Sequence, residues 1–94
     1  MSPRERVRAR VLVSGRVQGV NYRAFAKDEA AFRKVAGWVG NSPDGRVEAV
    51  FEGRKEAVEA MIRWCHTGSP AAEVRAVEIH WEPSRGERGF RVRR

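Results

Sequence analysis

Apolar and polar residues alternate along several stretches of this chain, which is the pattern of a β-strand with one buried face. In the first stretch, Val7 to Ser14, apolar residues take every odd position and most even positions are polar. Less regular alternation predicts four further strands, at residues 37–41, 46–53, 74–81 and 90–93. The Ser42-Pro43-Asp44-Gly45 segment is a turn signal, so the second and third strands are expected to form a hairpin.

Two stretches instead repeat apolar residues every three or four positions, as an amphipathic helix does. The first runs from about Asn21 to Lys34, and its apolar residues are Tyr22, Phe25, Ala26, Ala30 and Phe32. Asn21 or a neighbour is expected to cap its start. The second runs from Arg54 to about His66, with an apolar stripe of Ala57, Val58, Met61, Ile62 and Cys65. The Gly68-Ser69-Pro70 segment ends it with helix-stop residues.

The order of these elements is strand, helix, strand, strand, helix, strand, followed by a short edge strand. This order predicts a ferredoxin-like α+β sandwich of the split βαβ type. Two helices would cover one face of a mostly antiparallel sheet of four or five strands. We expect residues 1–94 to form a single domain. The fold serves many unrelated activities, so function must be argued from the site.

The composition indicates a globular protein, with 41% hydrophobic and 33% charged residues. One cysteine excludes an internal disulfide framework, and the first ten residues lack the apolar stretch of a secretory signal. We therefore expect a cytoplasmic protein. No apolar run approaches the ~18–20 residues of a membrane span, so no membrane partner is expected.

The net charge of +7 is concentrated at the two ends of the chain. Residues 1–10 carry four arginines and one glutamate, and residues 85–94 carry five arginines and one glutamate. Between them, basic and acidic residues cancel. Such ends could attract polyanions, steer a small anionic substrate or keep the protein soluble.

The segment from Gly15 to Arg23 is the best candidate for chemistry. A glycine-containing loop there joins a strand to a helix, and its main-chain amides can converge on an anion. Arg23 follows in the first helical turn, where its guanidinium can hold phosphate oxygens. This reading predicts a phosphate or carboxylate cradle. The alternative is an ordinary tight turn with a surface arginine. The glycine spacing fits neither an NTPase P-loop nor a dinucleotide fingerprint.

Asn41 is the second candidate, at a strand end before a turn. Its carboxamide carries donors and an acceptor together and can orient a water molecule. Asparagine before a turn is, however, most often only a turn residue.

Two segments together resemble the signatures of the acylphosphatase family. They are GRVQGVNYR at 15–23 and GWVGNSPDGRVE at 37–48. The resemblance extends over essentially the whole chain, through GSPAAEV at 68–74 and Gly89-Phe90 in the last strand. It implies hydrolysis of the carboxyl–phosphate bond of small acyl phosphates, with inorganic phosphate as a product.

The resemblance also implies roles for individual residues. Arg23 would bind the phosphoryl group and Asn41 would position the attacking water. The main-chain cradle would be formed by Gln18, Gly19, Val20, Asn21 and Tyr22. Electrostatic positioning suffices for a carboxylate leaving group, so we expect no cofactor and no metal. A compact chain with charged edges favours a monomer.

The chain departs from the family pattern at two places. Family members usually end the first helix with Leu-Gly, where this chain has Arg33 and Lys34. Either Phe32 takes over the packing, or this helix end is irregular. Arg33 itself must pair or extend its charge to water. Gly40 stands where the family often has a basic residue, and this difference could loosen the strand end at Asn41 or slightly lower the attraction for substrate.

Other polar residues have simpler interpretations. Cys65, His66 and His80 lack metal-ligand spacing, and Cys65 is expected to be a buried small hydrophobe. Asp44 and Glu48 are expected in the turn and on the solvent face, rather than as an acid and base. The tryptophans are expected to be packing or helix-flank residues, and they are Trp38, Trp64 and Trp81.

Nucleic-acid binding is the second hypothesis. RNA-recognition motifs share this fold and carry a strand that begins like Arg88-Gly89-Phe90. Here the match stops after three residues and lies on the last strand instead of the third. A phosphate-binding module without catalysis is the third hypothesis.

Overall fold

The computed structural model describes residues 5–93, so residues 1–4 and 94 of the arginine-rich ends lie outside the described part. Every predicted strand and helix is present, with ends within two residues of those predicted. The elements are β1 (Arg6–Arg16), α1 (Tyr22–Arg33), β2 (Ala36–Asn41), β3 (Val47–Arg54), α2 (Lys55–Thr67), β4 (Glu73–Glu82) and β5 (Phe90–Arg93).

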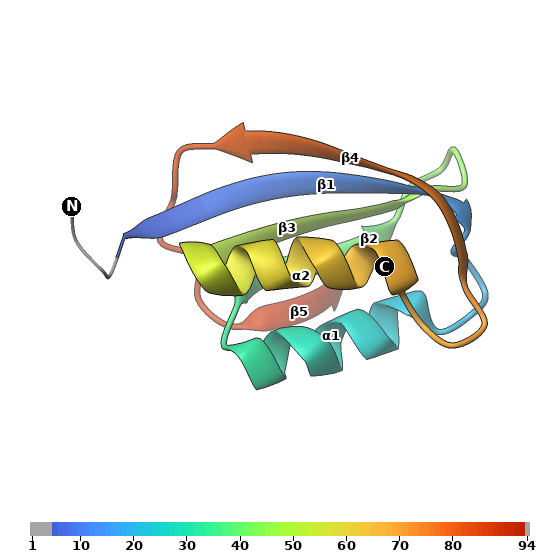
Figure 1. The fold of residues 1–94 in the computed structure, drawn as a ribbon, viewed down its shortest axis with the longest axis horizontal. Helices are drawn as coiled ribbons and strands as arrows, with labels where there is room; N and C mark the ends of the chain where they lie inside the picture. The colour runs from blue at the N-terminus through green and yellow to red at the C-terminus, as the bar shows by residue number, and fades with distance from the viewer. Residues whose placement is uncertain (1–4, 94) are drawn as a thin grey trace.

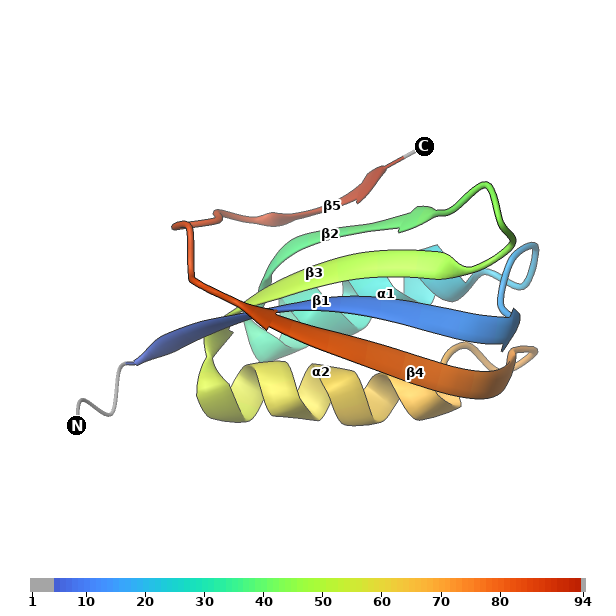
Figure 2. The same cartoon turned by 90° about the horizontal axis from the view of Figure 1, so that it is seen from above.

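The strands form one sheet in the order β4-β1-β3-β2-β5. All neighbours are antiparallel except β2 and β5, which are parallel. Both helices lie on one side of the sheet (Figure 1), and β4 and β5 form its two edges (Figure 2). The predicted ferredoxin-like arrangement is confirmed. Neither helix in residues 5–93 has the length and apolar content needed to cross a bilayer.

The core lies between the sheet and the helices, as the alternation predicts. On β1 and β3 the inward residues are Ala9, Val11, Val13, Val47, Ala49 and Phe51. The helices contribute Tyr22, Ala26 and Ala30 from α1 and Val58, Met61, Ile62 and Cys65 from α2. Cys65 is 1% exposed, which confirms its prediction as a buried hydrophobe.

Two aromatic residues of α1 lie outside this core. Phe25 is 42% and Phe32 is 79% exposed. Successive helical residues are about 100° apart, so a helix that turns Tyr22, Ala26 and Ala30 inward carries these two on its flank. Phe32 therefore does not take over the packing at the end of α1.

The end of α1 is also regular, contrary to the second expectation. Lys34 adopts the left-handed conformation at φ 59°, and its N–H donates to the Ala31 carbonyl at 3.2 Å. The N–H of Val35 donates to the Ala30 carbonyl at 2.9 Å. These are the two bonds of a Schellman cap, with lysine where glycine is usual. Arg33 pairs with Glu29 at 2.7 Å, one helical turn earlier.

A buried carboxylate on the helix-free face fixes the connection to β5. Glu52 is fully buried and accepts a hydrogen bond from the Arg8 guanidinium at 3.1 Å. It also accepts from the main-chain N–H groups of Arg85 at 3.0 Å and Gly86 at 2.7 Å. The β4–β5 loop is thereby held against the sheet, and β5 is placed beside β2.

Candidate active site

The turn between β1 and α1, residues 17–21, is named the cradle loop below. Gly19 adopts φ 74° and Asn21 φ 63°, two left-handed residues that reverse the chain. Asn21 is the N-cap residue, as predicted, but its side chain makes no capping bond. The first helical bond runs from Phe25 N–H to the Asn21 carbonyl at 3.1 Å. Within residues 5–93, no acceptor is found for the amides of residues 18–23.

The base of the cradle loop needs a glycine for steric reasons. Gly15 has φ 123°, and a Cβ there would lie 2.2 Å from the main-chain oxygen of Glu73 on β4. A Cβ at Gly19 would meet nothing within 4 Å, so that glycine is required only by its conformation. The two glycines thus serve different purposes.

The loop is held from behind by the segment around the end of α2. The Ser69 hydroxyl donates to the Val20 carbonyl at 2.7 Å, and the Tyr22 hydroxyl donates to the Cys65 carbonyl at 2.9 Å. The Tyr22 ring lies 5.2 Å from that of Trp64. Burial raises the pKa of Tyr22 far above its usual value, so its hydroxyl stays neutral and its role is structural.

Gln18 joins the loop to the β2–β3 turn. Its Nε2 donates to the carbonyls of Ser42 at 2.9 Å and Arg46 at 3.0 Å. Sequence reasoning placed Gln18 and Val20 in the cradle, but neither is among the residues that line the cavity. The Gln18 side chain is turned to the hairpin, and Val20 is buried.

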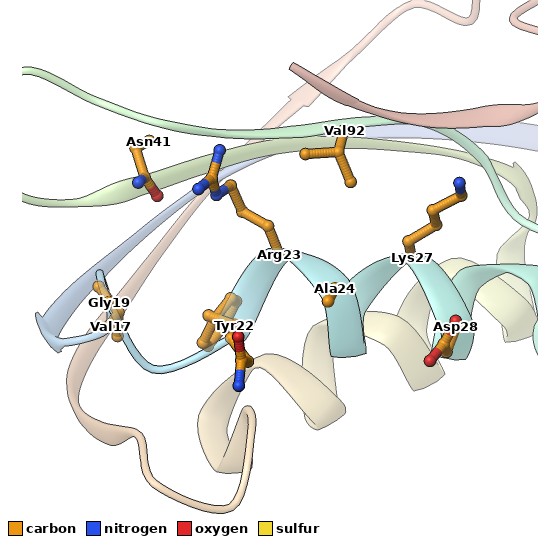
Figure 3. Close-up of a pocket in the computed structure, with 10 residues that line it drawn as sticks. Val17, Gly19, Tyr22, Arg23, Ala24, Lys27, Asp28, Asn41 and Val92 are labelled. Carbon is orange, nitrogen blue, oxygen red and sulfur yellow. The ribbon is translucent and has the colours of Figure 1, made fainter. Parts of the chain in front are cut away.

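Arg23 and Asn41 come together at one cavity of about 550 Å³. Arg23 lies on the first turn of α1 and Asn41 at the end of β2, and their side chains point toward one another (Figure 3). The residues lining the cavity are Val17, Gly19, Asn21, Tyr22, Arg23, Ala24, Lys27, Asp28, Asn41 and Val92.

Both side chains are available to a ligand. Arg23 makes one hydrogen bond, from Nη1 to the Arg93 carbonyl at 3.4 Å, and no carboxylate in residues 5–93 pairs with it. The Asn41 carboxamide makes no hydrogen bond to the described residues. Among residues 5–93, the cavity therefore combines an arginine with no carboxylate partner, main-chain amides with no acceptor and a carboxamide with no hydrogen bond. These groups can bind a phosphoryl group and orient a water molecule beside it.

Gly40 does not loosen the strand that carries Asn41. Asn41 pairs with Val47, and the Ser42 N–H donates to the Arg46 carbonyl at 2.7 Å. A Cβ at Gly40 would lie 3.3 Å from the Cβ of Arg93, whose guanidinium stacks 4.2 Å above the ring of Trp38. A basic side chain from β5 thus lies beside the position where the family often has one.

The other titratable candidates form ion pairs or are buried in the core. Asp44 binds Arg46 at 2.9 Å, which lowers the pKa of Asp44 to about 2, and Glu48 pairs with Arg10 at 2.9 Å. Burial raises the pKa of Cys65 to about 12. In residues 5–93, no cluster of three or more metal-ligand side chains is found.

Comparison with known proteins decides the family. A family model described as Acylphosphatase matches residues 9–92. The chain belongs to the acylphosphatase family. An acylphosphatase of Natronomonas pharaonis is 58% identical over 90 residues, covering 96% of this chain and 98% of the relative.

Solved acylphosphatase structures have the same fold. The crystal structure from Bacillus subtilis matches with a TM-score of 0.90 at 38% identity, covering 94% of this chain and 99% of that one. The structure from Coxiella burnetii matches with a TM-score of 0.92 at 32% identity, covering 99% of this chain and all of the other.

In this family member, the two segments that suggested the family meet at the cavity. Sequence reasoning anticipated Arg23, Asn41 and the cradle loop, but missed the other end of the cavity. That end is lined by Ala24, Lys27, Asp28 and Val92. Lys27 follows Arg23 by four residues, so helical spacing alone could have placed both on one face.

Proposed function

We propose that this chain hydrolyses small acyl phosphates to a carboxylate and inorganic phosphate, with Arg23 binding the phosphoryl group and Asn41 holding the attacking water. The observation that carries the proposal is the shared cavity. Arg23 and Asn41 line it together with the cradle loop, although they come from different elements.

The phosphoryl group binds between the cradle loop and Arg23. The unpaired amides near Gly19, Asn21 and Tyr22 donate to its oxygens at the start of α1, where the helix dipole also favours an anion. The Arg23 fork contributes two more donors and a full charge. Phosphoryl transfer has a loose transition state with charge on the equatorial oxygens, so these donors act where charge is highest.

The leaving group needs no proton from the enzyme. A carboxylate with a pKa of ~4 leaves as an anion at neutral pH. This agrees with the neighbouring hydroxyl of Tyr22, which is buried and committed to the Cys65 carbonyl. The chemistry therefore requires position and positive potential more than acid–base groups.

The Asn41 carboxamide orients the water. Its oxygen accepts a hydrogen bond from one O–H of the water, and its NH₂ group can donate to the water oxygen. Because the side chain has no partner among residues 5–93, it can turn to serve this role. The water then lies on the Asn41 side of phosphorus.

The proposal extends to cofactor and assembly. The amides and Arg23 supply the positive potential, so the reaction is proposed to be metal-independent. A monomer is proposed as the active unit, following the sequence expectation. A cytoplasmic location follows the sequence expectation, and a nucleic-acid partner is not part of the proposal.

The test is turnover of benzoyl phosphate in excess EDTA, with Arg23→Ala beside Arg63→Ala as a control on the exposed side of α2. The wild-type chain should hydrolyse the substrate, and inorganic phosphate should compete. Arg23→Ala should lose roughly 10²–10⁴-fold in rate while its circular dichroism is unchanged. If Arg23→Ala keeps most of its turnover, the assignment is wrong. RNA binding with a steep salt dependence and no turnover would favour the nucleic-acid hypothesis instead.

A further inference from the structure

The cavity continues past Arg23, away from Asn41. Figure 3 shows Asn41 at one end and Lys27 and Asp28 at the other, with Arg23 between them. Lys27 lies one helical turn beyond Arg23, which is about 6 Å along α1. The phosphoryl group and the water would occupy only the Asn41 end. The Lys27 end is thus free for another part of the substrate.

The stereochemistry of the proposed reaction decides which part that is. The attacking and leaving oxygens of a phosphoryl transfer lie roughly in line through phosphorus. If the water is held at Asn41, the carboxylate must leave on the opposite side. The inference rests on the proposed function in this respect: the acyl group then points toward the Lys27 end.

The charge at that end is set by Lys27 and Asp28. No carboxylate in residues 5–93 pairs with the Lys27 ammonium, whereas Arg33 on the same helix is paired with Glu29. Figure 3 shows the Lys27 side chain directed to the β5 side, near Val92, and the Asp28 carboxylate turned the other way. An acyl group beneath β5 would therefore meet the ammonium first.

We propose that the Lys27 end of the cavity binds the acyl group, and that Lys27 selects acyl phosphates whose acyl group carries a second negative charge. Asp28 acts against this selection, because this acidic residue lines the same end of the cavity. Together Lys27 and Asp28 set the charge preference at this end of the first cavity.

A second groove offers room for the body of such an acyl group. It has a volume of about 350 Å³, shares Lys27 with the first cavity and runs between α1 and β5. Its walls are mainly apolar and include Ala30, Ala31, Val35 and Phe90, and Lys34 also lines it. An aromatic or short aliphatic acyl group would thus be accommodated with its charge near Lys27.

The experiment compares benzoyl phosphate with 4-carboxybenzoyl phosphate, a rigid pair that differs in one carboxylate. The value of kcat/KM for each is measured for the wild-type chain, Lys27→Met and Asp28→Asn at low ionic strength. The ratio of the charged to the uncharged substrate should fall roughly three- to tenfold in Lys27→Met and rise in Asp28→Asn. Lys55→Met, at the start of α2 and outside both cavities, is the charge-matched control and should leave the ratio unchanged.

The outcomes separate the two proposals. An equal loss of kcat/KM for both substrates in Lys27→Met would show that Lys27 does not select acyl groups by their charge. The same change of ratio in Lys55→Met would show this too. If the wild-type chain hydrolyses neither substrate, the proposed function itself fails and this inference fails with it. A change of ratio that disappears at high salt supports the charge selection.

Discussion

The side-chain amide of Gln18 ties the cradle loop to the Ser42 carbonyl, one residue beyond Asn41, at 2.9 Å. The same nitrogen donates to the Arg46 carbonyl at 3.0 Å, on the other side of the turn. One carboxamide thus spans both arms of the turn that follows β2. It sets the separation between the amides proposed to hold phosphate and the side chain proposed to hold water.

Gln18→Met should lower kcat by about tenfold or more, because a misplaced water loses the in-line arrangement. The apolar replacement keeps the shape of the side chain but donates no hydrogen bond. The inhibition constant for inorganic phosphate should change far less, since Arg23 and the loop amides remain in place. Steady-state kinetics with phosphate as a competitive inhibitor measure both quantities.

Protein stability provides the control for this variant. The Ser42 and Arg46 carbonyls each keep a main-chain donor within the turn, so unfolding free energy should fall by only about 0.5–1 kcal/mol. A loss of phosphate affinity as large as the loss of kcat would mean that Gln18 supports the cradle itself and not its spacing.

Asn41→Ala should lose roughly 10²–10³-fold in kcat, the usual effect of deleting one polar group that acts in a transition state. Phosphate inhibition should stay within about threefold of wild type, because the cradle donors are unchanged. Parallel losses in kcat and in phosphate affinity would instead assign Asn41 to phosphate binding. Thermal unfolding shows whether the end of β2 is intact in the variant.

The fold could be predicted because its core residues recur along the sequence at the regular spacings of strands and helices. The inward residues of β1 and β3 alternate, and Tyr22, Ala26 and Ala30 repeat every four positions. The candidate site could be predicted from two motifs with local geometry, which are a loop before a helix and a strand end before a turn. Local sequence sets each of these, and the sheet brings them together by placing β1, β3 and β2 side by side.

The contacts that refine the site could not be predicted in this way. Gln18 donates hydrogen bonds to main-chain carbonyls 24 and 28 residues away. Because every residue has a main-chain carbonyl, the residue types do not indicate which ones Gln18 contacts. Glu52 occupies the polar phase of an alternating strand, yet a loop more than 30 residues later buries it completely. The expectation that Phe32 packs at the end of α1 is wrong. All the buried residues of α1 together determine which side of the helix faces the sheet, and one large residue does not.

Lowering the pH should destabilise the protein through Glu52. Burial alone would raise the pKa of this carboxyl, but the amides of Arg85 and Gly86 and the Arg8 guanidinium outweigh it and bring the pKa below its ordinary value. A depressed pKa contributes stability above the unfolded-state value of 4.5, and that stability is lost as the pH falls through the folded-state value. Urea unfolding between neutral and strongly acidic pH should show the decline.

Glu52→Gln isolates this contribution. At neutral pH the variant should lose about 2–4 kcal/mol of unfolding free energy. The Arg8 guanidinium loses its buried counter-charge, and three main-chain N–H groups lose a charged acceptor. Its stability should then vary less with pH below the unfolded-state pKa of glutamate. Glu73→Gln, on the exposed start of β4, should match the wild-type curve. An unaltered acid slope in Glu52→Gln would assign the effect to other carboxylates, such as Glu82.

Lys34→Gly should stabilise the protein by about 1 kcal/mol, since glycine adopts the left-handed conformation without the strain that a Cβ imposes. The Lys34 side chain is exposed and makes no described hydrogen bond or ion pair, so little is lost with it. Lys34→Ala keeps the Cβ and removes only the charged stem, and its stability should stay within about 0.5 kcal/mol of wild type. The difference between the two variants in urea unfolding therefore measures the backbone strain at this cap. Equal stabilities for glycine and alanine would show that the end of α1 carries no such strain.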